Sequence, residues 1–248
     1  MGILNVTPDS FSDGGRFLHP AGAFDHALKM TEEGADIIDI GGESTRPGAR
    51  PLPLQEEMDR VMPVLEKLIR QGVRVSVDTT KPEVAEEALR LGAGIVNDIS
   101  GLQNGPQIAW IAAEYGAKLV IMHMQGTPQN MQEAPAYADV VREIIRFFRR
   151  QMKVASEAGL DKAQIILDPG IGFGKRLEDN VAIFRELERF ADLGCPLMIG
   201  ASRKSMIDGI APASVRERLP GSLVLAAAAV LRGADWSGCM MWRRPYRH

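Results

Sequence analysis

The sequence predicts an α/β fold in which parallel strands form a barrel. Short apolar runs alternate with longer amphipathic segments from the first residue to about residue 235. The runs are rich in Ile, Val and Leu on both faces, which is typical of parallel strands covered by helices. A polar cluster follows nearly every run. The alternation and composition of the runs indicate a parallel sheet, and the polar clusters distinguish a closed barrel from an open sheet.

Seven apolar runs are expected to be strands. They cover residues 1–6, 35–40, 73–78, 94–99, 118–124, 164–168 and 196–201. Segments with helical periodicity lie between and after them, at residues 20–34, 55–71, 82–91, 106–116, 136–158, 178–191 and 214–232. Pro82 suits the first turn of its helix, and Gly72, Gly92 and Gly159 suit positions just beyond helix ends.

The polar clusters distinguish a closed barrel from an open sheet. In an open sheet the site gathers between a few strands, where the strand order reverses. Polar residues at all seven strand ends suit a barrel whose carboxyl-terminal rim surrounds one pocket. Helix capping or turn formation would explain any one Asp or Asn, but not seven clusters. We therefore expect a (β/α)8 TIM barrel over residues 1–235, although only seven strands are recognisable.

Composition and charge exclude several other classes. The 29 Lys+Arg and 32 Asp+Glu give a formal net charge of −3, and 45% of the residues are hydrophobic, as in ordinary globular proteins. The mild acidity argues against a non-specific nucleic-acid binder. No segment approaches the roughly 20 apolar residues that span a membrane, and no secretory leader is recognisable. Cys195 and Cys239 cannot make a disulfide framework, so a cytoplasmic location is expected.

Three loops after strands carry residues suited to chemistry. NVTPDSFSDGG (5–15) resembles a mobile lid, and GGESTRPGA (41–49) holds Arg46, which can bind a phosphate or carboxylate through two parallel hydrogen bonds. SRKS (202–205) places two adjacent cations at a strand end, which favours an anionic or electron-rich substrate. Each could also be a plain surface loop. GIGFGKR (170–176) looks like a phosphate loop but has neither P-loop nor dinucleotide spacing.

His123, in MHMQG, suggests either metal binding or acid–base chemistry. A lone His near a strand end is more often a hydrogen-bonded structural residue. His19, His26 and His248 form no ligand spacing with it, so no metal site is expected there.

Seven motifs resemble those of one family. They are NVTPDSFSDGG, GGESTRPG, SVDTTKPEVA, NDIS, MHMQGTP, LDPGIGFGK and SRKSMI, in this order and at natural separations. On these motifs the chain resembles the dihydropteroate synthases, members of the pterin-binding barrel family, from residue 1 to about 235. Pterin-dependent methyltransferases share the barrel and its Asp/Asn pattern. They lack the first and last motifs, so that alternative is disfavoured.

The resemblance implies a transferase of folate biosynthesis. The family condenses 6-hydroxymethyl-7,8-dihydropterin pyrophosphate with p-aminobenzoate to give 7,8-dihydropteroate and pyrophosphate, and it binds sulfonamides as aminobenzoate mimics. No general base is obviously required, because the aniline nitrogen is already neutral at pH 7. Catalysis is expected to rest on leaving-group stabilisation and positioning. The family forms homodimers.

The resemblance also implies roles for particular residues. The pterin set comprises Asp78, Asn97, Asp168 and Lys204, with apolar walls from Met122, Phe173 and Gly200. The aminobenzoate set comprises Phe11, Ser12, Thr45, Pro47, Ser202 and Arg203. Asn5 and Arg46 face the pyrophosphate, and Asn5 is also the protein ligand for Mg²⁺, which usually keeps water and phosphate oxygens as its other ligands. Asp9 and Asp39 are secondary catalytic candidates beside Asp78 and Lys204.

The tail, residues 236–248, departs from the family. It reads WSGCMMWRRPYRH, whereas the family continues with an eighth strand close to Ile-Val-Arg-Val-His-Asp-Val and a last helix. Because Met and Trp have single codons, Cys-Met-Met-Trp must be TGY ATG ATG TGG. A one-base shift gives Val, Leu or Met, then His or Tyr, then Asp and Val. We therefore interpret the tail as frameshifted and truncated.

The altered tail predicts an incomplete barrel, with the eighth strand and last helix altered or missing. The family's pyrophosphate-binding Arg and His are absent from it. An open seam between the first and seventh strands and a weakened homodimer are expected. The family's short segment before the first strand is also expected to be missing. Two function classes stay open: an active synthase and a non-catalytic pterin-binding barrel.

Overall fold

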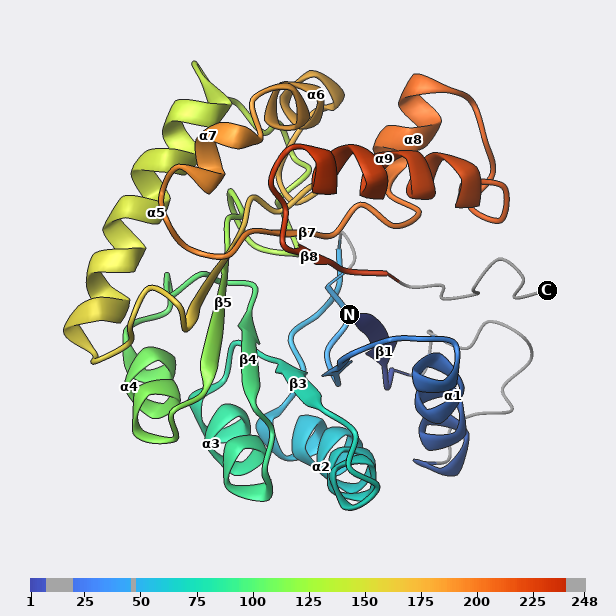
Figure 1. Ribbon diagram of the computed structural model, residues 1–248, viewed down its shortest axis with the longest axis vertical. Coiled ribbons are helices and arrows are strands. Elements are labelled where there is room, and N and C mark those ends of the chain that lie inside the picture. The colour runs from blue at the N-terminus through green and yellow to red at the C-terminus, as the bar shows by residue number, and fades with distance from the viewer. Residues whose placement is uncertain (8–19, 46–47, 240–248) are drawn as a thin grey trace.

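Among the residues that the computed structural model describes, eight strands run parallel, and helices surround them (Figure 1). The structure describes residues 1–7, 20–45 and 48–239. Six strands form one sheet in chain order: β1 (Gly2–Asn5), β2 (Ile38–Gly41), β3 (Val75–Asp78), β4 (Ile95–Asp98), β5 (Lys118–Met122) and β6 (Ile165–Asp168). The last two, β7 (Met198–Ile199) and β8 (Trp236–Ser237), pair with each other.

Backbone contacts join the two sheets into a ring. A bridge between Leu167 and Leu197 connects β6 to the residue before β7, and a bridge between Gly2 and Cys239 connects β1 to the second residue after β8. The Cys239 amide donates to the Met1 carbonyl, and the Ile3 amide donates to the Cys239 carbonyl at 3.1 Å. The predicted TIM barrel is therefore confirmed.

The eighth strand is altered but present. It has only two residues, where the sequence predicted an altered or missing strand, and no helix follows it within residues 1–239. The predicted open seam is wrong, because residues 236–239 pair with β7 on one side and β1 on the other. Backbone hydrogen bonds do not depend on side-chain identity, so an unusual sequence can still occupy this position.

Nine helices lie among the described residues. They are α1 (Pro20–Glu32), α2 (Leu54–Arg70), α3 (Pro82–Leu91), α4 (Gln107–Glu114), α5 (Val140–Glu157), α6 (Leu177–Arg185), α7 (Glu188–Ala191), α8 (Ser205–Ile210) and α9 (Leu219–Leu231). The helix expected at 178–191 is divided into α6 and α7, and α8 was not predicted. None of these helices has the length and apolar character needed to cross a bilayer.

The helix sequences explain which faces are buried. In α5, Val141, Ile144, Ile145 and Phe148 recur at helical spacing and are all buried. The helix begins after Asp139, whose carboxylate accepts a hydrogen bond from the Arg142 amide at 3.0 Å. Helices of this kind pack on the outside of the strands and make the larger of the apolar cores.

A second apolar core fills the barrel interior on the amino-terminal side of the strand-end polar residues. It consists of Met1, Ile37, Ile95, Val120, Ile166 and Met198, with Trp236 of β8 packed against them. Side chains in a strand alternate between faces, so the residue two positions further along points the same way. Above this apolar layer, the interior therefore receives Asp39, Asn97, Met122, Asp168 and Gly200. The strand period alone gathers these residues at one mouth.

Trp236 is expected to contribute more stability than an exposed tryptophan does. Trp236→Ala should cost about 2 kcal/mol, because it leaves a gap beneath the apolar layer. At roughly 2–4 °C per kcal/mol for a chain of this size, thermal melts should show a fall of about 4–8 °C. Trp110→Ala, in α4, removes a side chain that is 54% exposed and serves as the control. Equal losses in the two variants would contradict this account of β8.

Candidate active site

The strand ends on one side of the ring bring three polar residues and one glycine into register. Asn5, Gly41, Asp78 and Asn97 are consecutive pairing partners across β1, β2, β3 and β4. An ideal Cβ on Gly41 would lie 3.3 Å from Asp78 Oδ2 and 3.6 Å from Asn5 Oδ1. The side chains of Asn5 and Asp78 therefore converge above Gly41, and a larger residue there would separate them.

Asp39 and Asn97 form a buried pair within the barrel. The Asn97 Nδ2 group donates to Asp39 Oδ2 at 2.9 Å, and Asp39 is only 2% exposed. Burial raises the pKa of Asp39, while the hydrogen bond from Asn97 opposes the rise. Asn97 Oδ1 is buried and accepts no hydrogen bond within the described structure. Such an orphaned acceptor fits a ligand that brings its own donor.

Asp78 lies near several other carboxylates. Burial raises its pKa well above the usual range, and the neighbouring Asp39 raises it further. Just beyond β3, Thr79 Oγ1 donates to the buried Glu57 at 2.6 Å. The Lys81 ammonium binds both Glu57 and Glu43, which ties the loops after β2 and β3 to α2. These contacts fix the backbone on which Asp78 stands.

Asp168 and Lys204 form the opposite side of the mouth. Burial raises the pKa of Asp168 to about 6, although a hydrogen bond from the Gly170 amide at 2.8 Å acts to lower the pKa. Burial lowers the pKa of Lys204 to about 8, while the charges of Asp168 and Asp78 oppose that shift. One ammonium therefore interacts with carboxylates from β3 and β6. Its Nζ also lies 4.1 Å from the centre of the Phe173 ring.

The loops after β5 and β6 pack against each other without space for extra atoms. Gly170 has φ +69°, and a Cβ there would come within 2.1 Å of the His123 carbonyl oxygen. Gly174 has φ +57°, and its Cβ would come within 2.4 Å of the Gln125 carbonyl oxygen. Both positions require glycine for its backbone conformation and for its lack of a side chain.

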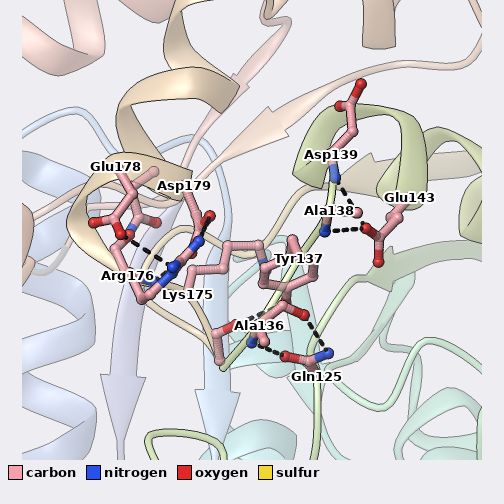
Figure 2. Close-up of polar contacts among 12 residues, drawn as sticks. Gln125, Ala136, Tyr137, Ala138, Asp139, Glu143, Lys175, Arg176, Glu178 and Asp179 are labelled. Atoms are coloured by element: carbon pink, nitrogen blue, oxygen red, sulfur yellow. Dashed lines mark hydrogen bonds and ion pairs between the residues drawn. The ribbon is translucent and has the colours of Figure 1, made fainter. Parts of the chain in front are cut away.

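Figure 2 shows the polar contacts around the same two loops. The Gln125 side chain exchanges two hydrogen bonds with the backbone of Ala136, at 3.1 and 3.0 Å. Arg176 binds Asp179 through Nε at 2.9 Å and through Nη2 at 3.0 Å. The loops are thus braced internally as well as against each other.

The 170–176 segment is not arranged as a phosphate loop. The Gly170 amide is bonded to Asp168, the Gly172 amide to Asn180 Oδ1 at 2.8 Å, and the Phe173 amide to the Gly170 carbonyl. Because these N–H groups already have internal acceptors, they do not form an anion cradle. The weak phosphate-loop interpretation of this sequence is therefore wrong.

His123 is held as a structural residue. Lys175 Nζ lies 3.0 Å from His123 Nδ1, and the ring meets Phe147 edge-on with 4.9 Å between centroids. Burial lowers the pKa of His123 to about 2, and the Lys175 charge lowers it further. The imidazole is therefore neutral at pH 7, with Nδ1 as an acceptor.

The remaining predicted site residues are placed as follows. Ser202 and Arg203 lie between β7 and α8, and the Arg203 amide donates to Ser222 Oγ at 2.9 Å. Thr45 is partly exposed after β2. Residues outside the described part of the chain are Asp9, Phe11, Ser12, Arg46 and Pro47. Within residues 1–7, 20–45 and 48–239, no cluster of three or more His, Cys, Asp or Glu could hold a metal.

A separate hollow of about 390 Å³ lies beside α5 and α7. Its lining includes Arg142, Arg146, Arg149 and Arg189, and none of the strand-end residues. The convergent carboxylates and the cation at the barrel mouth are the chemically distinctive group, so we assign the candidate site there.

Comparisons with known proteins agree with this assignment. The profile of the pterin binding enzyme family matches residues 1–237. The dihydropteroate synthase of Escherichia coli strain K12 is 48% identical over 235 residues, covering 94% of this chain and 83% of the relative. The Yersinia pestis dihydropteroate synthase, solved with a sulfonamide drug complex, is 44% identical with a TM-score of 0.92. The match covers 98% of this chain and 88% of the Yersinia pestis chain.

A third relative was solved with an aromatic acid. The Xanthomonas albilineans dihydropteroate synthase with 4-aminobenzoic acid is 44% identical, with a TM-score of 0.90. The match covers 97% of this chain and 86% of the Xanthomonas chain. A parallel barrel with this site defines a barrel enzyme acting at its carboxyl-terminal rim. The chain belongs to the pterin-binding enzyme family, and within it to the dihydropteroate synthases, which are transferases of folate biosynthesis.

Sequence reasoning missed the residues that support the site. Lys175 was read only as part of a glycine-rich loop, yet it is buried among three acceptors. The Glu57–Lys81–Glu43 network joins residues far apart in sequence, so no local pattern could reveal it. The only available signal was a lysine within an otherwise apolar, glycine-rich run.

Asp168 is expected to make the protein less stable as the pH rises from about 4 to 6. In that interval folded Asp168 holds a proton that the unfolded chain has lost, so unfolding becomes easier as the pH increases. Asp168→Asn should remove this dependence and stabilise the ligand-free protein at pH 7 by up to about 3 kcal/mol. Thermal melts at pH 4–7 test this, with exposed Asp161→Asn as control. An unchanged pH profile in Asp168→Asn would refute the assignment.

Proposed function

We propose that this chain condenses 6-hydroxymethyl-7,8-dihydropterin pyrophosphate with p-aminobenzoate at the barrel mouth. The observation that carries the proposal is the convergence of Asp78, Asn97 and Asp168 with a single Lys204 ammonium. A pterin ring presents amide and guanidine-like donors along one edge. Two carboxylates and the buried Asn97 Oδ1 supply acceptors for such an edge.

The pterin would lie between apolar and cationic surfaces. Met122 of β5 is buried, and Phe173 packs against its cluster. Gly200 leaves open space, because a Cβ there would meet no atom within 4 Å. Lys204, held above the Phe173 ring, would contact both the pterin and the aminobenzoate. Asp39 would act indirectly by orienting the amide of Asn97.

Departure of pyrophosphate requires positive charge, for which Mg²⁺ is the proposed cofactor. Asn5 is the proposed protein ligand, because its Oδ1 faces the mouth beside Asp78. Mg²⁺ prefers oxygen ligands and usually keeps water and phosphate oxygens in addition to a few protein groups. Asn5 therefore fits the ion without a dense cluster of acidic ligands. When bound, Mg²⁺ would neutralise the leaving phosphates, and Arg46 would contribute a further cation.

The aminobenzoate would approach from the loops after β1, β2 and β7. Phe11, Ser12, Thr45 and Pro47 would enclose its ring, while Ser202 and Arg203 would hold its carboxylate. Asp9 is a further candidate in the first loop. The carbon–oxygen bond to pyrophosphate would break first and leave a methylene cation that the pterin ring stabilises. The neutral aniline nitrogen would then attack this carbon and release a proton. Positioning and leaving-group stabilisation would supply the rate acceleration, without a dedicated general base.

The direct test mixes both substrates with Mg²⁺ and measures pyrophosphate release and 7,8-dihydropteroate. Asp168→Asn and Lys204→Met should lower kcat/KM by at least about 100-fold, equivalent to ~2.7 kcal/mol of transition-state stabilisation. Chelation with EDTA should stop the reaction. Lys153→Met changes an exposed residue of α5, removes the same positive charge and should retain full activity.

The same measurement decides the alternative function. The unusual tail lacks the phosphate-binding Arg and His of the family, which favours a non-catalytic pterin-binding barrel. Pterin binding with no pyrophosphate release would establish that alternative. Absence of both binding and release would reject the two functions together, and methyl transfer from a methyl-pterin donor would revive the methyltransferase reading.

We further infer that two copies of the chain associate through α9. This helix exposes Leu223, Val224, Val230 and Leu231, the last at 86%, on one helical face. The homodimer is the family's usual form, and a second copy would cover this face. Val224→Glu combined with Leu231→Glu should yield monomers by light scattering at micromolar concentration. Trp110→Glu, on α4, should leave the mass unchanged, and a monomeric parent chain would refute the proposal.

A cytoplasmic location is proposed on the chemistry of the two cysteines. Neither Cys195 nor Cys239 forms a disulfide. Cysteines outside disulfides are typical of a reducing compartment, where the substrates of folate biosynthesis would also be made. The proposed partners are these small molecules, not nucleic acid or membrane.

A further inference from the structure

Lys175 is a buried cation with no role in the proposed pterin-binding set. Its side chain is 4% exposed. Burial lowers its pKa to about 7, and the nearby carboxylates of Asp168 and Asp179 oppose that shift. Burying a lysine is unfavourable unless its N–H groups are satisfied. The groups that satisfy its N–H donors therefore indicate the role of this buried lysine.

Three acceptors surround the Lys175 ammonium. Nζ lies 3.0 Å from His123 Nδ1, 3.1 Å from the His123 carbonyl oxygen and 2.9 Å from the Phe173 carbonyl oxygen. In its protonated form Lys175 has three N–H donors, so each acceptor can receive one. His123 belongs to the loop after β5, and Phe173 to the loop after β6. One side chain thus fastens the two loops together from inside.

Two further bonds join the same loops nearer the surface. Gln132 Nε2 donates to the Gly172 carbonyl at 2.9 Å, and Tyr137 Oη donates to the Gly174 carbonyl at 2.6 Å. Figure 2 draws Tyr137 and Lys175 among the residues of these two loops. The carbonyls of residues 172 and 174 are therefore held from the opposite loop. The carbonyl of residue 173 is held by Lys175 of its own loop, which is in turn bonded to His123 of the opposite loop. Of the three donors, only Lys175 is buried and charged.

The segment held in this way carries one wall of the site. The Phe173 ring lies under the Lys204 ammonium, with 4.1 Å between Nζ and the ring centroid. Asp168 precedes the segment, and its carboxylate interacts with the charges of both Lys204 and Lys175. Movement of residues 172–174 would displace the ring while leaving the strand ends in place.

We infer that Lys175 is a positioning residue, which fixes the loop after β6 so that Phe173 faces the pterin. It touches neither substrate and acts through the backbone of Phe173. This inference rests on the pterin subsite proposed above. A rigid supporting residue improves binding because the wall is ordered before the ligand arrives.

The test compares Lys175→Met with the parent chain. Methionine keeps the length and apolar stem of lysine but donates no hydrogen bond. We expect the Kd for 6-hydroxymethylpterin, measured by fluorescence, and the KM for the dihydropterin pyrophosphate to rise at least 10-fold. The KM for p-aminobenzoate at saturating pterin should change less than 3-fold, because its proposed subsite lies on other loops. A merely structural defect would raise both KM values or lower only the melting temperature.

His123 variants separate the hydrogen bond from general loosening. His123→Asn keeps an acceptor close to the Nδ1 position and should retain pterin affinity within about 3-fold. His123→Leu fills similar space without an acceptor and should weaken pterin binding more than Asn does. Identical affinities for the two variants would show that the Lys175–imidazole contact does not help to position the loop after β6. Lys153→Met controls for the loss of one positive charge.

The outcomes for binding and function are distinguishable. A parent chain that fails to bind 6-hydroxymethylpterin would reject the proposed pterin subsite itself. A parent chain that binds it, with Lys175→Met binding equally well, would overturn the role of Lys175 and leave the proposed function standing. Selective loss of pterin affinity in folded Lys175→Met would support both.

Discussion

Asp39, Asp78 and Asp168 place carboxylates in the mouth of a barrel that is apolar below them, and the charge of Lys204 compensates for Asp78 and Asp168. Desolvation of several like charges is unfavourable, and it raises the pKa of each carboxyl group. The cation reduces this cost by interacting with Asp78 and Asp168 from opposite sides. The same arrangement leaves acceptors and one ammonium facing an open space, which is the requirement for binding a donor-rich ring beside an anionic group.

This charge arrangement depends on closure of the ring. Lys204 follows β7, whereas Asp78 ends β3, so the two meet only when the sheet curves round on itself. Residues 236–239 complete the curve through backbone bonds to Ile199, Met1 and Ile3. Their unusual side chains do not prevent this, since hydrogen bonding between strands uses the main chain. Trp236 also contributes packing beneath the interior layer.

Much of the fold and of the pterin side of the site follows from local patterns. Apolar runs with a period of two identify the strands, and that period places Asn97 and Asp168 above the interior apolar layer. By the same rule, the Asp98 side chain points away from the mouth. Its carboxylate accepts hydrogen bonds from the Ser100 and Leu102 amides, both at 2.8 Å. The short α8 gave no sequence signal, because six residues contain too few turns for a periodic pattern.

The sequence by itself determined the barrel, its family and the strand-end residues, because strand periodicity and contiguous motifs are local properties of the chain. Tertiary structure decided how the ring closes at Cys239 and how the mouth is supported. Lys175 illustrates the difference: its three acceptors come from His123, 52 positions away, and from its own loop. A sequence shows that a lysine is present, but only packing shows that it is buried, which groups satisfy its donors and what they hold in place.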